Sequence, residues 1–276
     1  MQRTYLTVVA LLVAGLVGWP SGAHAQDAPL VFRVPVTGTV DMGLAPFIER
    51  AIRDAEGAGV SVVVLDIDTP GGRVDSAERI ADAISDSGVP VYAFVNRRAF
   101  SAGALIALAT QGIYMLPGSV VCAVTPVDGT GTKAPEKFVS AMRSEMRALA
   151  EARGLDPAIA EAMVDESLAV PGVVDAGRLL TLTMEEAVRI GYATETEDFS
   201  TLLDELGVAG AEITDFGVNW AERFVRFFSN PVVAPFLLVR FLVAVSMPFF
   251  ICLTHMKKEQ RKSKYMSCLL YTSPSP

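Results

Sequence analysis

Residues 60–72 read VSVVVLDIDTPGG, and this segment decides which fold the sequence predicts. Its apolar, β-branched part, 60–67, is typical of a strand that is buried on both faces, and Pro70-Gly71-Gly72 then ends the strand in a turn. Short apolar runs also occur at 31–36, 91–95 and 113–116, with amphipathic segments between them. Strands that alternate with helices indicate βαβ units around a mostly parallel sheet, so we expect an α/β fold.

The segments between and after the strands carry helical patterns. Apolar residues at every third or fourth position predict a helix over 74–87 whose buried face holds Ala77, Ile80, Ala81 and Ile84. The same spacing predicts a long helix over 135–153 with an apolar stripe of Phe138, Met142, Met146 and Leu149. Asp156 is an N-cap residue for a helix that reaches 164, and the capping-box pattern Thr183-Met184-Glu185-Glu186 opens another that ends near Gly191.

The N-terminus has the order of a secretory signal. Arg3 precedes an apolar run at 6–17, and Ala23-His24-Ala25 then supplies a small-x-small cleavage site. We therefore expect a signal peptide at 1–25 that is cleaved after Ala25. An uncleaved N-terminal anchor is the alternative, although the run is shorter than the ~20 residues that a membrane span requires.

A second apolar stretch, 227–254, is long enough to cross a bilayer, and we expect a transmembrane segment there. A basic cluster follows it and belongs on the cytoplasmic side: Lys257, Lys258, Arg261, Lys262 and Lys264. The region between the signal and this segment therefore faces the periplasm or the cell exterior. It divides into an enzyme domain at 26–205 and a juxtamembrane segment at 206–226.

The two ends of the membrane segment differ in character. Trp220 opens an amphipathic stretch, 220–228, and suits the depth of the membrane interface. The basic tail, 255–276, finishes in residues that share neither composition nor pattern with the rest of the chain, so its native origin is open.

Charge and cysteine content exclude several classes of function. Between Gln26 and Arg226 the chain holds 30 acidic and 16 basic side chains, a net charge of −14, with no basic cluster, so nucleic acid is not an expected partner. Cys122 is the sole cysteine of the exported domain, so no disulfide forms within it. Its apolar neighbours indicate a small buried side chain rather than a nucleophile.

The positions of the histidines limit the chemistry further. His24 lies in the signal and His255 lies beyond the membrane segment, so a Ser-His or Cys-His mechanism is excluded from the exported domain. A zinc hydrolase lacks ligands for the same reason, and we expect neither a metal nor a cofactor. Lysine is the other base that pairs with serine, and the domain holds only Lys133 and Lys137.

A lysine acts as a base near neutral pH only if its pKa falls from about 10.4 to about 7, which desolvation can achieve. Lys137 precedes Phe138 at the apolar edge of the long helix, whereas Lys133 lies in a Gly/Thr loop that is open to water. We therefore prefer Lys137 as the base. The alternative is an ordinary solvated lysine in the first turn of a helix.

Ser101 is the candidate nucleophile. It lies within Ala99-Phe100-Ser101-Ala102-Gly103-Ala104, after the third strand and at the head of an apolar helix, where backbone N–H groups can hold an oxyanion. An N-cap serine is the simpler interpretation, and this feature alone does not decide between the two. The turn at Gly71-Gly72 ends the neighbouring strand and allows the backbone to approach a bound chain closely. Together the two strand ends favour a functional site.

At these residues the chain resembles the NfeD family of membrane-bound, ClpP-class serine proteases, which are related to signal peptide peptidase A. The resemblance covers about 31–235. It rests on Asp68-Thr69-Pro70-Gly71-Gly72, Ser101-Ala102-Gly103, Glu136-Lys137, Leu149-Ala150-Glu151-Ala152-Arg153-Gly154, and Met184-Glu185-Glu186-Ala187 before Gly191. It implies a ClpP/crotonase-like βαβ spiral, a catalytic dyad of Ser101 and Lys137, and an oxyanion hole built from Gly71, Gly72 and Ala102.

The same resemblance implies which molecules the protein meets. Substrates are expected to be hydrophobic segments of membrane proteins, with a stomatin- or prohibitin-like protein and membrane lipid as partners and a homo-oligomer, dimer or larger, as the assembly. Family members continue through several spans into an OB-like barrel, whereas this chain leaves the pattern near Val239. That departure indicates a truncated or frame-shifted C-terminus.

Two other functions stay open at this point. A catalytically inactive ClpP-like scaffold would bind membrane proteins through the same domain, because the sequence does not show that Lys137 reaches Ser101. A crotonase-like enzyme would use the Gly71 and Gly72 amides to hold a thioester enolate, but an exported domain does not meet cytosolic CoA esters. We therefore expect a membrane-anchored serine endopeptidase.

Overall fold

The computed structural model describes residues 28–122, 124–127, 130–229, 233–244, 246–247 and 257. The expected signal peptide at 1–25 lies outside these residues, and so does the expected basic tail apart from Lys257.

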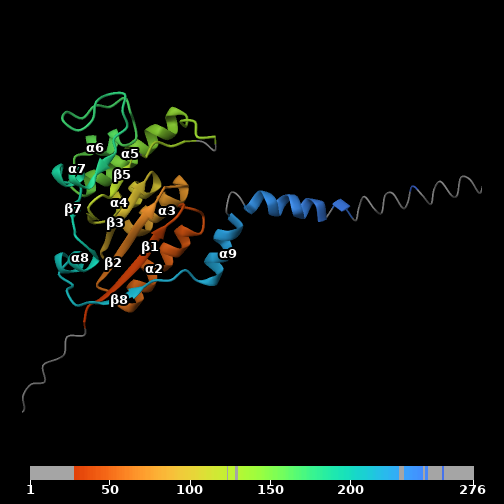
Figure 1. Cartoon of the computed structure of the whole chain (residues 1–276), viewed down its shortest axis with the longest axis horizontal. Coiled ribbons are helices and arrows are strands. Elements are labelled where there is room, and N and C mark those ends of the chain that lie inside the picture. The colour runs from red at the N-terminus through yellow and green to blue at the C-terminus, as the bar shows by residue number, and fades with distance from the viewer. Residues whose placement is uncertain are drawn as a thin grey trace, which may run out of the picture.

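A single sheet forms the centre of the domain (Figure 1). Within the described part of the chain its strands follow the order β6-β5-β3-β2-β1-β8, and β4 pairs with β3 and with β7. Every strand pair is parallel except β5 with β6. The strands are β1 (Leu30–Thr37), β2 (Val62–Thr69), β3 (Val91–Phe100), β4 (Ile113–Met115), β5 (Val120–Cys122), β6 (Leu182–Thr183), β7 (Thr194–Glu195) and β8 (Glu212–Asp215).

A register shift between β2 and β3 positions the end of β3. Ile67 pairs with Val95, whereas Thr69 pairs with Ala99, so β3 carries two extra residues between these pairs. Such a bulge re-aims the strand that contains it. It places the last residues of β3 beside Thr69, which is the residue just before the Pro70-Gly71-Gly72 turn.

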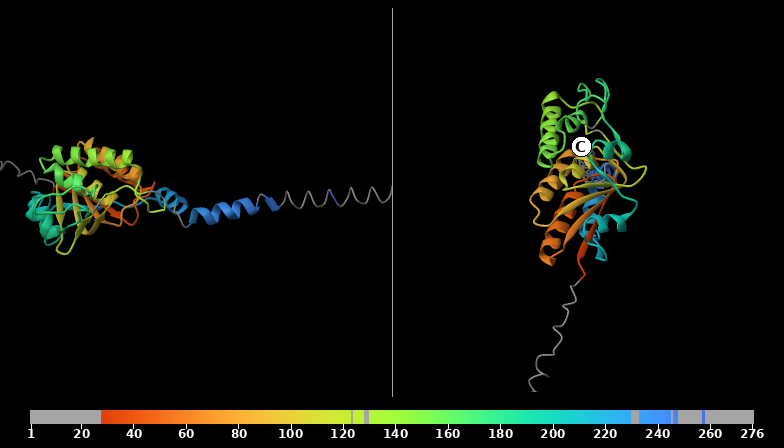
Figure 2. Two further views of the ribbon diagram at one scale, coloured as in Figure 1. Left: turned by 90° about the horizontal axis from the view of Figure 1, so that it is seen from above. Right: turned by 90° about the vertical axis from the view of Figure 1, so that its left-hand side faces the viewer.

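Side chains of β2 alternate between the two faces of the sheet. Val63, Leu65 and Ile67 join the larger core, which also includes the buried faces of α2 (Leu44–Ala58), α3 (Val74–Ser85) and α4 (Ala102–Ala109). Val62 and Val64 face a smaller cluster with α8 (Phe199–Glu205). The sheet is therefore covered by helices on both sides, as Figure 2 shows.

The remaining helices follow the expected patterns closely. α5 (Glu136–Ala152) is the predicted long helix, Asp156 caps α6 (Pro157–Ala162) by accepting a hydrogen bond from the Ala158 N–H, and the predicted capping box opens α7 (Met184–Arg189). One part of the prediction for α5 is wrong. Its buried residues are Val139, Met142, Met146 and Ala150, whereas Phe138 is 53% exposed.

The four strands and the helix over 74–87 that the sequence predicted are confirmed as β1 to β4 and α3. β3 is longer than predicted, because it continues through Phe100 to reach Ser101. Cys122 is partly exposed rather than buried, with its Sγ 3.1 Å from Thr181 Oγ1. β8, whose residues are all exposed, pairs with β1 in the segment that was expected to be a juxtamembrane connector.

The transmembrane segment expected at 227–254 is described only in part, and it stays a prediction. No helix among the described residues is by itself both long and apolar enough to cross a membrane. The segments Trp220–Phe228 and Val233–Ala244 pass the test for length and composition only as a pair, and they are bent by 76° relative to each other. Part of the expected span, 248–254, lies outside the described residues.

Candidate active site

Ser101 occupies the junction between β3 and α4, as predicted. Its backbone has φ 50° and ψ −118°, and it is the one non-glycine residue with a positive φ in the part of the chain that the structure describes. A side chain in this region of conformational space costs about 1–3 kcal/mol and is typical of functional sites. Ser101 is the N-cap residue of α4, but its side chain forms no cap hydrogen bond, so capping by the hydroxyl does not account for the serine at this position.

The Gly71-Gly72 turn lies directly against this serine. A Cβ added to Gly71, which has φ 94°, would lie 2.7 Å from both Phe100 O and Ser101 Cβ. A Cβ on Gly72 would lie 2.3 Å from Val40 O. Both contacts are closer than real Cβ atoms permit, so only glycine fits at either position. The structure therefore brings the predicted turn and the predicted nucleophile together.

Val40 and Thr69 hold the turn in place. The Val40 N–H donates to Gly71 O at 2.9 Å, and the Arg73 N–H donates to Val40 O at 2.8 Å. The buried Thr69 hydroxyl donates to Gly38 O at 2.6 Å and accepts from the Gly71 N–H at 3.0 Å. The turn is thus fixed to the segment that follows β1 before any ligand binds.

These bonds change which amides can hold an oxyanion. The Gly71 N–H is already bonded to Thr69. The N–H groups of Gly72 and Ala102 have no hydrogen-bond partner among the described residues. Of the three predicted positions, Gly72 and Ala102 therefore have free donors, and Gly71 contributes its close approach to Ser101.

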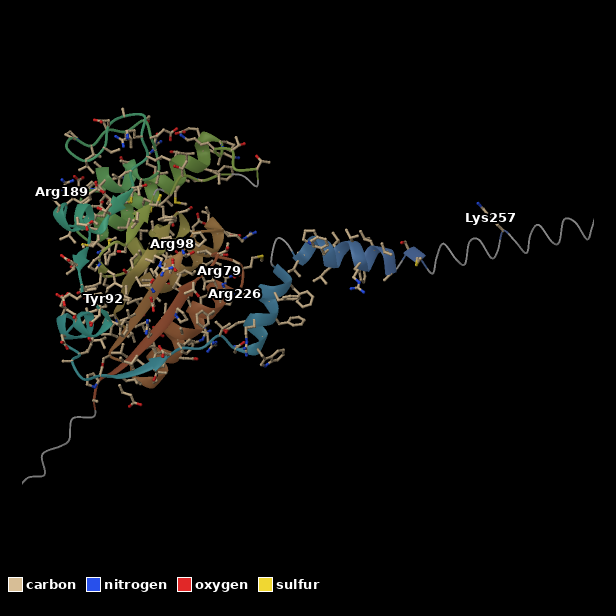
Figure 3. All side chains as sticks on the ribbon, in the orientation of Figure 1. Arg79, Tyr92, Arg98, Arg189, Arg226 and Lys257 are labelled. Atoms are coloured by element: carbon tan, nitrogen blue, oxygen red, sulfur yellow. The ribbon has the colours of Figure 1, made fainter. Side chains whose placement is uncertain are left out.

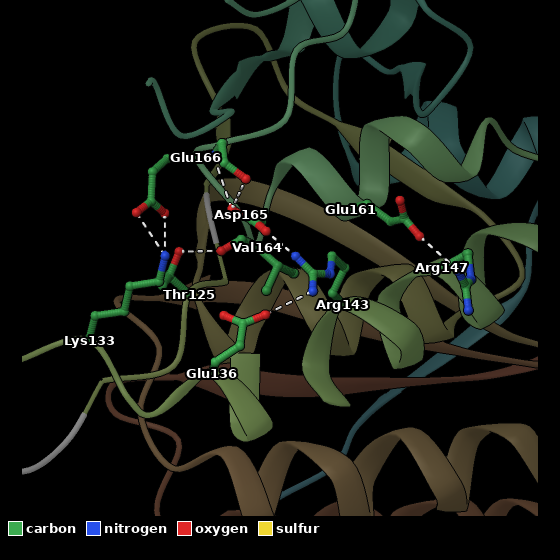
Figure 4. Close-up of polar contacts among 10 residues, drawn as sticks. Thr125, Lys133, Glu136, Arg143, Arg147, Glu161, Val164, Asp165 and Glu166 are labelled. Carbon is green, nitrogen blue, oxygen red and sulfur yellow. Dashed lines mark hydrogen bonds and ion pairs between the residues drawn. The ribbon is translucent and has the colours of Figure 1, made fainter. Parts of the chain in front are cut away.

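Lys133 is occupied by an ion pair. Its Nζ donates to both carboxylate oxygens of Glu166, at 2.7 and 2.9 Å, and Arg143 pairs with Asp165 and Glu136 nearby (Figure 4). The hydrogen bond to Glu166 raises the pKa of Lys133. A lysine with a raised pKa is less often in the neutral form that a general base requires near pH 7, so Lys133 is the weaker candidate.

Lys137 lies in the first turn of α5, and its surroundings differ from the expectation. It is exposed rather than buried, and its Nζ lies 4.8 Å from the centre of the Phe138 ring. No hydrogen bond or ion pair joins it to another described residue, Ser101 included. The single chain thus brings Ser101, Gly71 and Gly72 together without showing a contact to Lys137.

An apolar pocket of about 320 Å³ lies between α3, the pairs Pro126-Val127 and Ala134-Pro135, and α5. Its lining includes Val74, Pro126, Val127, Phe138 and Met142, with Glu78 at one side. Val74 begins α3 two residues after Gly72, so the pocket lies next to the turn. Sequence reasoning missed this pocket, because Phe138 fits the apolar stripe of α5 and only the structure shows that it is exposed.

Glu145, on α5, is the most perturbed carboxyl of the described residues. Burial, with smaller contributions from the charges of Glu78 and Asp82 on α3, raises its pKa to about 7. No group of His, Cys, Asp and Glu residues that could hold a metal ion occurs in the part of the chain that is described.

Comparison with known proteins identifies the family. Residues 30–216 match the model of the NfeD1b N-terminal domain. The membrane protein NfeD1b of Bacillus subtilis is 38% identical over 245 residues, which are 88% of this chain and 56% of that protein. The membrane-bound protease PH1510 of Pyrococcus horikoshii is 25% identical over 263 residues, 86% of this chain and 55% of the relative. The chain thus spans little more than half the length of these relatives.

Solved structures agree on the fold. A membrane-bound stomatin-specific protease domain, 1510-N, with a lysine replaced by alanine and a substrate peptide bound, superposes with a TM-score of 0.63 at 23% identity, covering 73% of this chain and 98% of that one. The 1510-N protease from Pyrococcus horikoshii, specific for a stomatin homologue, gives 0.57 at 22%, covering 73% and 99%. The predicted ClpP-like α/β fold is confirmed. With most of its length matched to one domain model and to a relative at 38% identity, the chain belongs to the NfeD1b family.

Proposed function

We propose that the domain is a serine endopeptidase in which Ser101 is the nucleophile and Lys137 the general base. The observation that carries the proposal is the strained backbone of Ser101, held against the Gly71-Gly72 turn. The N–H groups of Gly72, in that turn, and of Ala102, the residue after Ser101, have no hydrogen-bond partner among the described residues. Such strain persists only where the surroundings enforce it, and it is concentrated at functional sites. Relatedness to a membrane-bound protease at 25% identity supports the same reading.

The chemistry follows from these groups. Ser101 Oγ attacks the carbonyl carbon of a peptide bond while its proton passes to the neutral amine of Lys137. The N–H groups of Gly72 and Ala102 stabilise the oxyanion that forms. Lys137 then returns the proton to the leaving amine, and water hydrolyses the acyl-enzyme. No metal or cofactor takes part.

The apolar pocket suggests how Lys137 becomes a base. Phe138 lines the pocket and also lies beneath the Lys137 ammonium, so a bound apolar side chain removes water from both. Desolvation favours the neutral amine over the ammonium. An extended apolar segment of a membrane protein suits this arrangement, and a stomatin-like protein is the partner that the 1510-N relative suggests.

Labelling with a fluorophosphonate probe tests the dyad in the full chain. We expect Ser101→Ala and Lys137→Ala to abolish labelling, and to lower cleavage of a hydrophobic stomatin-type peptide roughly a thousandfold or more, because both groups act in one proton transfer. Lys133→Ala is the matched control and should keep most of the activity. Full activity in Lys137→Ala, or loss in Lys133→Ala alone, would contradict the assignment.

The exposure of Lys137 favours one second candidate, a scaffold that binds membrane proteins without cleaving them. A scaffold would bind the hydrophobic peptide as tightly after Ser101→Ala as before, and the unmodified chain would neither label nor cleave. A polar peptide of equal length separates the substrate class: equal or faster cleavage of the polar peptide means that the preference for apolar segments is wrong.

A further inference from the structure

Helix α9 (Trp220–Ser229) presents its apolar side chains to solvent. Trp220 is 77% exposed, and Phe224, Phe227 and Phe228 are about half exposed or more. These side chains, with Val225, form what we call the aromatic face of α9. An amphipathic helix on a globular protein normally turns its apolar face to the core. The reversed orientation indicates an apolar neighbour outside the domain.

The opposite face of α9 is bound to the domain by charged groups. Arg50 on α2 donates to both carboxylate oxygens of Glu222, at 2.7 and 2.9 Å, and Glu222 is only 9% exposed. The Asn219 N–H also donates to Glu222 Oε2, and the Glu222 N–H donates to Asn219 Oδ1, so the two side chains cap the start of the helix. A two-pronged arginine–carboxylate pair fixes orientation as well as distance.

One turn later, Arg226 forms a second attachment, at the junction between α9 and the domain (Figure 3). Its Nε donates to Asp41 Oδ2 at 3.0 Å and its Nη2 to Thr37 O at 3.2 Å. Its Cγ lies 2.5 Å from where a Cβ on Gly43 would be, so the side chain passes over that glycine. Attachments at 222 and 226 lie on one side of the helix, so the aromatic face is held outward.

The chain beyond α9 indicates what that neighbour is. Its next helix, within Val233–Ala244, also exposes large apolar side chains, among them Phe236, Leu238 and Phe241. The two helices are bent by 76°. If the second helix enters a bilayer along its normal, α9 lies nearly in the membrane plane, with Trp220 at the depth that tryptophan favours. Figure 1 shows the second helix extending away from the domain.

We propose that the aromatic face of α9 binds the boundary between headgroups and acyl chains of a phospholipid bilayer and lies in the plane of the membrane. Because an apolar helix follows α9 in the sequence, lipid is favoured over a second copy of the chain. The exposed Arg223, beside Phe224, can bind lipid phosphate. The proposal concerns where the domain sits, and it holds whether or not Ser101 is a nucleophile.

Tryptophan fluorescence of the full chain in phosphatidylcholine vesicles tests this. Trp19 and Trp220 are the only tryptophans, so Trp19→Phe leaves Trp220 as the sole reporter. We expect lipids brominated near the headgroup end of the acyl chain to quench Trp220 more strongly than lipids brominated near the chain terminus. A control chain moves the reporter to α7, on the other side of the domain, by Trp220→Phe with Val188→Trp; there we expect no quenching.

Two further readouts make the outcome decisive. Phe224→Ser with Phe228→Ser, both exposed positions, should reduce the quenching of Trp220 toward the α7 control while the far-UV circular dichroism is unchanged. Stronger quenching by the deep bromines would mean that α9 inserts across the bilayer, and a blue-shifted emission without bromine quenching would mean that protein covers the face. Either result, or quenching no greater than at α7, overturns the proposal.

Discussion

Ser101 holds a backbone conformation that glycine adopts freely and serine does not. The surrounding structure enforces it, since the Ala104 and Leu105 N–H groups both donate to Ser101 O and Gly71 lies against its Cβ. The sequence placed a serine at this junction but gave no means of seeing the strain, because φ is set by the packing of β3, α4 and the turn together.

Removing the strain should stabilise the protein. Ser101→Gly relieves the positive φ, whereas Ser101→Ala keeps it, so we expect the glycine variant to be more stable than the alanine variant by about 1 kcal/mol. Urea unfolding of the two variants measures the difference. Equal midpoints would mean that the backbone at 101 relaxes freely and stores no strain.

Gly71 offers a sharper test of the site. Gly71→Ala places a Cβ 2.7 Å from Ser101 Cβ, and we expect peptide cleavage to fall about a hundredfold or more, the scale of losing oxyanion stabilisation. Gly118→Ala is the matched control, because Gly118 also has a positive φ, 79°, but no atom lies within 4 Å of an added Cβ. We expect both variants to lose stability. Similar cleavage rates for the two variants would mean that Gly71 is not part of the site.

At the scale of elements, Glu145 on α5 lies near Glu78 and Asp82 on α3, and this group of acids predicts how stability depends on pH. The pKa of Glu145 is raised to about 7, above its ordinary 4.5, so the folded state binds the proton more tightly than the unfolded state. The resulting stabilisation is complete below about pH 4.5 and is lost as the pH rises through about 7. The melting temperature should therefore decline over this interval.

Glu145→Gln isolates this contribution, because glutamine imitates the protonated carboxyl. We expect the variant and the unmodified protein to have the same melting temperature near pH 5. Near pH 8 we expect the variant to have the higher melting temperature. Glu151→Gln, on an exposed part of the same helix, is the control, because it removes the same charge from α5 at an exposed position. Identical profiles for Glu145→Gln and the unmodified protein would show that the carboxyl titrates normally.

The elements that the sequence predicted best are those with strong periodicity and a buried face. β2 and α3 owe their patterns to the core, so their residues carried the signal directly. Phe138 fitted the helical stripe of α5 but lines an open pocket, and periodicity does not distinguish a core from a pocket. Lys137 was expected to be buried because of this neighbour. β8, Glu-Ile-Thr-Asp, gave no signal because it is an exposed edge strand.

At the scale of the whole molecule, the candidate site could be predicted in part. Parallel strands end at one edge of a sheet, so the residues after β2 and β3 were bound to meet. The sequence could not show which N–H groups are free to hold an oxyanion. That depends on the Thr69 hydroxyl, which accepts a hydrogen bond from the Gly71 N–H. The path of the chain after residue 205 could not be predicted either, because β8 pairs with β1, which lies about 180 residues earlier in the sequence.

That return predicts where the domain can be shortened. A chain that ends after Glu205 loses the β8–β1 pairing and Phe216, whose ring lies 5.4 Å from Phe32 and 5.7 Å from Phe47. We expect it to be less stable than a chain ending after Ser229 by at least about 2 kcal/mol, measured by urea unfolding. Phe216→Ala in the full chain should show part of this loss. Equal stability of the two shortened chains would contradict a structural role for β8.

The ion pair between Asp41 and Arg226 joins residues 185 positions apart. Closing so long a loop is entropically unfavourable, and the contact forms only after the distant residue has been synthesised. Asp41 also accepts hydrogen bonds from the first amides of α2, and its neighbour Val40 holds the turn beside Ser101. A nascent chain that has not yet released residue 226 lacks this support. The support for the site is therefore completed only after residue 226 has emerged, more than a hundred residues after its nucleophile.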